Sequence, residues 1–268
     1  MQSLDNSPHI RPQWLVDVAL HLSSIGLLDR DNAAICGVAI KTIRRWRRLY
    51  ERRGLPRGGG SHSPPCPTCE GRELDERAYS ALLGFYLGDG HIVRVSTRRS
   101  TSLRLSVVQD AKYPDSVEEI AGLMEVVKKG GTWRKQVPGA VCVESIWRHW
   151  PCLFPQHGPG RKHHRPIVLA DWQREIVQRH PEQFLRGLFH SDGCRVANWA
   201  TRTNTVGVVV RHDYTRYFFS NMSDDIRGLC TWALELLSIP YKHDGRKIIS
   251  VARKEAVAVL DTFIGPKH

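Results

Sequence analysis

The sequence predicts an α+β protein with two pseudo-symmetric αββαββα halves, preceded by a small all-α unit. Three observations carry this prediction. Residues 82–90 and 185–193 read LLGFYLGDG and LRGLFHSDG, and share Leu, Gly, Asp and Gly at the same four places. Segments with strand and helix patterns follow each copy in the same order. Residues 12–54 read as three short helices with apolar residues at helical spacing.

The N-terminal unit is expected to contain helices at 12–24, 31–36 and 39–53, the last ending at Gly54. In the first of them, the apolar residues are Trp14, Leu15, Val18, Ala19 and Leu22. Residues 32–46 resemble a helix-turn-helix of bacterial regulators and transposases, with Val38, Ile43 and Trp46 as its core. Outward side chains on the third helix would then reach the major groove or phosphates: Lys41, Thr42, Arg44, Arg45 and Arg48. The alternative is a basic surface helix that binds nothing.

A Gly-, Pro- and Ser-rich stretch at 55–67 reads as a linker and leads into Cys66-Pro67-Thr68-Cys69, with His62 just upstream. Cys-x-x-Cys is half of a zinc knuckle, but a second Cys-x-x-Cys is absent. Distant ligands such as Cys152 or His157 would complete a structural Zn²⁺ site. A tight turn with two unligated thiols is the other interpretation.

Each half shows strand patterns after its copy of the repeated motif. In the first half, strands are expected at 92–95, 102–108, 132–136 and 140–146, with helices at 113–127 and just after 147–148. In the second half, strands are expected at 206–210, 217–220, 241–244 and 247–252, with helices at 224–237 and 254–263. Ser223 is placed to cap the helix at 224–237. Turns are expected at 97–102 and 201–205.

Each repeated motif should end a helix on an aspartate. Gly84 and Gly88, like Gly187 and Ser191, are spaced to form small-residue faces where two backbones approach closely. The glycine after each aspartate is expected to form a left-handed cap. A carboxylate at a helix C-terminus is unfavourable, and two adjacent helices bring two together. A hard divalent cation such as Mg²⁺ between them removes this conflict.

These motifs resemble those of the LAGLIDADG homing endonucleases, over about residues 73–268. The resemblance implies that Asp89 and Asp192 are catalytic metal ligands for Mg²⁺ or Mn²⁺. Residues 160–167 resemble the family's Gly-x-Lys…Ile-Pro segment, which makes Lys162 the basic catalytic residue, and Lys247 is the candidate in the second half. Leu87 and His190 replace the first Asp of the name motif, which is not the metal ligand. Arg186 replaces its Ala and is expected to face away from the partner helix.

The family's two sheets form a saddle over the DNA major groove, so the resemblance implies double-stranded DNA as partner and a monomer with internal pseudo-two-fold symmetry. Basic residues on the predicted strands and turns are the candidate DNA contacts: Arg94, Arg98, Arg99 and Arg104 in the first half, and Arg195, Arg202, Arg211 and Arg216 in the second. Taken singly, each is as well explained by a solvated strand face.

Composition agrees with a polyanionic partner, since 39 Lys and Arg against 27 Asp and Glu give a formal net charge of +12. No apolar run reaches about 18–20 residues, so no membrane span is expected. The seven cysteines are odd in number and scattered, as in a reducing compartment. We therefore expect a cytoplasmic, nucleoid-associated protein.

The domain boundaries expected are 1–56 for the helix-turn-helix unit, 57–72 for the linker with its cysteine pair, and 73–180 and 181–268 for the two repeats. Two functions fit these features. One is a metal-dependent double-strand DNA endonuclease of the homing type. The other is a non-catalytic transcriptional regulator that combines the same scaffold with a helix-turn-helix. Retention of both aspartates and Lys162 favours the enzyme.

Overall fold

The computed structural model describes residues 11–53, 64–96, 101–203, 205 and 207–267. The chain forms two compact units, residues 1–63 and 64–268. Residues 64–72, which the sequence placed in the linker, belong to the second unit, where Cys66 is buried in the core. The predicted contacts Arg98 and Arg99, like His62, lie outside the described residues.

The first unit contains three described helices, α1 (Gln13–Ser24), α2 (Asp29–Ile35) and α3 (Ile40–Arg53). Ile43 and Trp46 are buried as predicted. The inward face of α1 differs from the prediction, because Val16 and Ala19 are buried whereas Trp14 is 65% exposed. The predicted helical periodicity of α1 was therefore correct, but its buried face is rotated around the helix axis relative to the prediction. The helix-turn-helix assignment stays a prediction.

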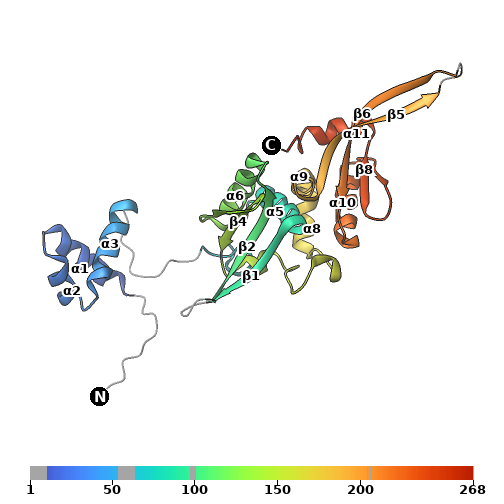
Figure 1. Cartoon of the computed structure of the whole chain (residues 1–268). Helices are drawn as coiled ribbons and strands as arrows, with labels where there is room; N and C mark the ends of the chain where they lie inside the picture. The colour runs from blue at the N-terminus through green and yellow to red at the C-terminus, as the bar shows by residue number, and fades with distance from the viewer. Residues whose placement is uncertain (1–10, 54–63, 97–100, 204, 206, 268) are drawn as a thin grey trace. The chain divides into compact units, whose positions relative to one another are not determined.

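The second unit has the predicted αββαββα order in both halves (Figure 1). The first half comprises α5 (Glu76–Asp89), β1 (Gly90–Ser96), β2 (Thr101–Asp110), α6 (Pro114–Lys128), β3 (Trp133–Val137), β4 (Ala140–Ile146) and α7 (Trp150–Leu153). The second comprises α9 (Pro181–Asp192), β5 (Gly193–Thr203), β6 (Val209–Ser220), α10 (Asp224–Leu236), β7 (Lys242–His243), β8 (Ile248–Val251) and α11 (Lys254–Asp261). Short α4 (Pro67–Glu70) precedes them, and the 3-10 turn η1 (Lys162–His164) and α8 (Asp171–Arg179) join the halves.

Both four-stranded sheets are antiparallel and have the same strand order, β1-β2-β4-β3 and β5-β6-β8-β7. Strands β4 and β8 take equivalent places, so the two sheets are related as the repeated sequence predicts. The fold class is thus confirmed for this unit. Among the described helices, none combines the length and apolar character needed to cross a membrane.

The second half differs from the prediction at its first two strands. Residues 206–210 and 217–220 were expected as separate strands, but 209–220 form the single strand β6, paired with β5 from Gly193↔Phe219 to Thr203↔Val209. Strand β5 lacks the apolar alternation of a half-buried strand because its outer part extends past the core with both faces exposed. Figure 1 shows this ribbon projecting from the body of the unit.

Helices α5 and α9 pack through the small residues of the repeated motif. A Cβ atom on Gly84 would lie 2.4 Å from the carbonyl oxygen of Phe184, and one on Gly187 would lie 2.1 Å from that of Ala81. Only a residue without a side chain permits this approach, as the sequence spacing predicted. The close packing brings the C-terminal ends of both helices together at one place.

Candidate active site

Asp89 and Asp192 are the last residues of α5 and α9 and lie at these adjoining ends. A Cβ atom added to Gly88 would lie 3.1 Å from Oδ2 of Asp192. The carboxylate of the second half therefore sits directly against the end of the first half's helix. The repeated motif thus delivers one carboxylate from each half to one site.

The glycines after the two aspartates do not form the left-handed caps expected from the sequence. Gly90 has φ −87° and ψ 151°, and Gly193 has φ −108° and ψ 167°, so both are extended and start a strand. Glycine is needed there for space, because an added Cβ would lie 2.6 Å from Cα of Tyr86 or 2.8 Å from Cα of Phe189. The chain therefore passes straight from helix to strand at each aspartate.

Burial is the main cause of the shifted pKa values of the two acids, and repulsion between them contributes at Asp89. Burial, together with repulsion from Asp192, raises the pKa of Asp89 from 3.8 to about 6, against the opposing effect of Lys162 and Lys267. Burial also raises the pKa of Asp192, although a hydrogen bond from Asn221 and the same two lysines oppose it. The site thus disfavours two unneutralised carboxylates near neutral pH.

Lys162 lies at the site as predicted, and it caps helix α5. Its Nζ donates to the carbonyl oxygens of Tyr86, Leu87 (3.0 Å) and Gly88 (2.9 Å). Burial lowers the pKa of Lys162 to about 8, against the attraction of both aspartates. The lysine therefore neutralises the negative end of α5 and also places a positive charge near the acid pair.

In the second half, this place belongs to Lys267 rather than Lys247. Nζ of Lys267 donates to the carbonyl oxygen of Ser191 at 3.1 Å, and both aspartates act on its pKa, which burial lowers. Lys247 has an exposed side chain whose charge acts on His163 and on neither aspartate, and its carbonyl oxygen accepts the N–H of Asn221 at 3.2 Å. The sequence does contain a signal for Lys267, because Gly160-Arg161-Lys162 recurs as Gly265-Pro266-Lys267. The two glycines have φ angles of +77° and +66°.

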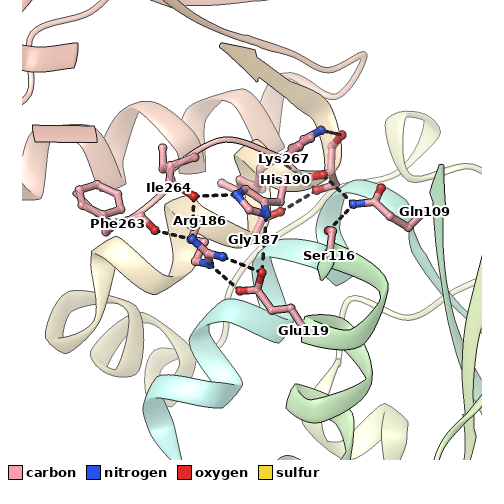
Figure 2. A network of polar contacts seen from close by, with 11 residues as sticks. Gln109, Ser116, Glu119, Arg186, Gly187, His190, Phe263, Ile264 and Lys267 are labelled. Atoms are coloured by element: carbon pink, nitrogen blue, oxygen red, sulfur yellow. Dashed lines mark hydrogen bonds and ion pairs between the residues drawn. The ribbon is translucent and has the colours of Figure 1, made fainter. Parts of the chain in front are cut away.

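The C-terminal segment that carries Lys267 is held by α9 and α6 (Figure 2). Arg186 donates to Oε1 and Oε2 of Glu119 at 2.5 and 2.8 Å, and to the carbonyl oxygens of Phe263 and Ile264 at 2.9 and 2.6 Å. Nε2 of buried His190 lies 2.8 Å from the same Ile264 oxygen. Arg186 and His190 thus position the C-terminal segment, and Arg186 faces α6 rather than α5.

Asn221 is a site residue that the sequence analysis missed. Its Nδ2 donates to Oδ2 of Asp192 at 2.6 Å, and its carbonyl oxygen accepts from buried Arg227. The residue directly follows β6 and precedes the Ser223 cap, whose Oγ accepts the N–H of Ile226 at 3.4 Å as predicted. No spacing in the sequence pairs it with Asp192, because the contact depends on the β5–β6 register.

The predicted saddle arginines divide into exposed and paired side chains. Arg94 and Arg202 are exposed, and Arg211 is 61% exposed although it pairs with Asp213. Arg104 pairs with buried Glu144 at 3.3 Å. Two further arginines of the second half are also paired. Arg216 pairs with Asp244 at 2.9 Å. Arg195 lies opposite Tyr217 in the β5–β6 pairing, on the core-facing side of the sheet, and donates to both carboxylate oxygens of Asp261.

On α3, the predicted basic residues gather around one hollow, which is lined by Lys41, Thr42, Arg44, Arg45, Arg47 and Arg48. Arg47 was not among the predicted contacts. Arg44 and Arg47 both pair with Asp29 of α2, at 3.0 and 2.8 Å. Four of the five predicted side chains are exposed and Thr42 is half-buried, so the outward orientation predicted for this helix agrees with the structure.

The predicted cysteine pair lies in a larger cluster. Cys66 and Cys69 are joined by His149 and Cys152, with one ligand atom of each within 4.8 Å of all the others. Of the two distant ligands considered from the sequence, Cys152 is therefore present and His157 is replaced by His149. The sequence signal for His149 is the segment His149-Trp150-Pro151-Cys152, which has the spacing of Cys66-x-x-Cys69 with His in place of the first Cys.

Comparisons with known proteins give similar folds only. No protein-family model and no curated protein matches the chain. The solved structures with a similar fold include the LAGLIDADG meganuclease I-AabMI bound to uncleaved DNA, with 12% identity over 69% of this chain and 82% of that one, and a TM-score of 0.44. Meganuclease I-SmaMI bound to uncleavable DNA shares 11% identity over 70% and 84% (TM-score 0.45). Homing endonuclease I-LtrWI bound to target DNA shares 8% over 71% and 85% (TM-score 0.43).

Proposed function

We propose that this protein is a site-specific, metal-dependent double-strand DNA endonuclease of the LAGLIDADG homing type. The observation that carries the proposal is the pair of carboxylates at the adjoining ends of α5 and α9, flanked by Lys162 and Lys267. A single chain supplies both acids and both lysines. The net charge of +12 and the exposed arginines of the two sheets fit a DNA partner.

The residues at the site fit a hard divalent cation. Asp89 and Asp192 offer only oxygen ligands, and burial raises the pKa of both, with repulsion from Asp192 adding to the shift at Asp89, so a bound cation would stabilise their charged forms. Mg²⁺ or Mn²⁺ bound there would stabilise the attacking and leaving oxygens of phosphodiester hydrolysis. Asn221 holds one oxygen of Asp192 and so orients that carboxylate.

Lys162 and Lys267 supply positive charge near the scissile phosphates. Each keeps its ammonium group at the site through backbone carbonyls, so little reorganisation is needed when negative charge develops on phosphate oxygens. Because the pKa of Lys162 is about 8, a lysine there remains mostly charged at neutral pH.

Plasmid cleavage with the full chain tests this proposal. The plasmid carries the DNA that flanks the protein's own gene, and the reaction contains Mg²⁺, Mn²⁺ or EDTA. We expect a linear product that requires the metal and that an Asp89→Asn/Asp192→Asn double variant does not form, although it still binds DNA. Asp171→Asn, an exposed carboxylate at the start of α8, is the control and retains cleavage. Cleavage by the double variant would contradict the role of the acids.

A transcriptional regulator on the same scaffold is the second candidate, and one observation favours it. Lys162 and Lys267 already cap the helix ends that carry the acids, which gives both lysines a structural use without metal. Basic α3 would then supply sequence-specific binding as a helix-turn-helix. Tight, salt-sensitive binding of one fragment without cleavage in any divalent metal would support the regulator.

A further inference from the structure

Four soft metal ligands from two distant segments meet where the chain enters the second unit. Cys66 and Cys69 bracket the start of α4, and His149 and Cys152 bracket the start of α7. Sγ of Cys69 lies 3.4 Å from Sγ of Cys152, which lies 3.7 Å from Nδ1 of His149. In a tetrahedral zinc site, Zn–S bonds of about 2.3 Å and Zn–N bonds of about 2.0 Å separate the ligand atoms by roughly 3.5–3.8 Å.

We propose that these four residues form a structural zinc site of the Cys₃His type. Three thiolates and one imidazole fill a tetrahedral shell, so no position stays open for water or substrate. The two half-sites have the same spacing, Cys-x-x-Cys and His-x-x-Cys, and each includes a proline at the start of its short helix. The site is separate in ligand chemistry from the acid pair, whose oxygen ligands suit a harder ion.

The second half-site is held in place by buried tryptophans. Trp147 and Trp150, which flank His149, are 2% and 0% exposed. Nε1 of Trp150 donates to the carbonyl oxygen of Ser145 at 2.9 Å, and Nε1 of Trp147 donates to that of Pro64 at 3.0 Å. The latter bond also brings the first residues of the unit towards α7. Both half-sites are therefore positioned by contacts that do not need the metal.

His149 requires one local change when zinc binds. Nε of Arg148 now donates to Nε2 of His149 at 2.7 Å, which leaves the ring proton on Nδ1. Ligation through Nδ1 moves that proton to Nε2, so Arg148 must give up this contact. Its side chain is 66% exposed and has Glu70 at 4.0 Å as an alternative partner, which makes the movement easy.

A zinc ion at this place would cross-link segments 83 residues apart, measured from Cys69 to Cys152. Such a link restricts the unfolded chain and therefore stabilises the first half. It would also fix the point at which the chain enters the second unit at Pro64. The site is thus expected to act on stability rather than on the hydrolytic chemistry.

Metal analysis of the full chain tests the site without DNA. We expect about one zinc ion per chain in the wild type, and loss of zinc in Cys69→Ser and His149→Ala. Cys142→Ser and His157→Ala are matched controls, since neither residue belongs to the cluster, and both retain zinc. Stripping zinc should lower the Tm of the wild type but not that of Cys69→Ser.

Cobalt substitution separates ligation from misfolding. The thiolate-to-cobalt charge-transfer absorption should be present in the wild type and stronger in His149→Cys, which keeps a full set of ligands. A wild type that holds no more metal than Cys69→Ser would overturn the proposal. So would a Cys69–Cys152 disulfide found by mass spectrometry of the unreduced protein. None of these outcomes depends on whether the protein cleaves DNA.

Discussion

Nζ of Lys267 lies 3.1 Å from the carbonyl oxygen of Ser191, the residue before Asp192. Nζ of Lys162 is bound in the same way at 2.9 Å to the carbonyl oxygen of Gly88, the residue before Asp89. Each half therefore ends its acidic helix with a lysine supplied by a Gly-x-Lys segment far along the chain. The acids and the lysines form one set of four groups, related by the pseudo-two-fold repeat.

This relationship predicts that both lysines are needed for cleavage. Lys162→Met or Lys267→Met should each lower the single-turnover cleavage rate by about 10²–10³-fold, because each removes a positive charge that the proposed function places near the scissile phosphate. Lys247→Met, which changes an exposed side chain, should leave the rate close to that of the wild type. An equal loss of rate in Lys247→Met would contradict the assignment of Lys267 as the lysine of the second half.

The raised pKa of Asp89 predicts how the stability of the metal-free protein depends on pH. Between 3.8 and about 6 the folded state binds more protons than the unfolded state at this group, so the contribution of Asp89 to stability should fall as pH rises through that window and level off above it. Thermal unfolding in EDTA checks this. The difference in Tm between the wild type and Asp89→Asn should shift against the wild type as pH rises through this window, and added Mg²⁺ should raise the Tm above pH 6 in the wild type but much less in the variant.

The close packing of α5 and α9 predicts a large penalty for any side chain at its centre. Gly187→Ala places a Cβ 2.1 Å from the carbonyl oxygen of Ala81, so the helices must separate, at a cost of about 3 kcal/mol or more in unfolding free energy. Denaturant unfolding measures this. Gly122→Ala and Gly228→Ala are helix controls with no atom near the added methyl group, and each should be neutral or stabilising by up to about 1 kcal/mol.

The contacts of Arg186 predict that the C-terminal segment loosens when this side chain is shortened. Arg186→Met leaves Glu119 without its bidentate partner and removes the Arg186 donor from the carbonyl oxygens of Phe263 and Ile264, of which Ile264 keeps only His190. Hydrogen exchange of residues 263–267 should rise, and cleavage should fall because Lys267 is displaced. Arg179→Met removes the similar but exposed bidentate pair with Glu76 and should change neither. Unchanged exchange in Arg186→Met would show that other contacts hold the segment.

Much of the fold was predictable because the repeated motif marks two equivalent helices. The Leu, Gly, Asp and Gly positions fixed the α5–α9 contact and the location of both acids. The β5–β6 ribbon was not predicted correctly, because strands that extend beyond the core lose the apolar alternation on which the prediction depends. The left-handed caps were wrong because glycine was required for close approach rather than for its φ angle.

Other site residues depend on contacts between distant segments and carry weak local signals. Asn221 reaches Asp192 only through the pairing of β5 with β6. Lys267 and the His149–Cys152 half-site did have signals, a second Gly-x-Lys and a second ligand pair. In both cases residues differ between the copies, among them Pro266 for Arg161 and His149 for Cys66, so that the spacing rather than the residue identity carries the signal.

The ion pair between Arg186 and Glu119 has a consequence for how the gene could be divided. Leu83, the counterpart of Arg186 in the first copy, is fully buried and cannot make this contact. In a pair of identical second halves, the half-buried Arg186 side chains would lack Glu119, and a pair of identical first halves would lack Arg186. If the two halves were expressed as separate polypeptides, they should therefore assemble as a heterodimer and not with copies of themselves.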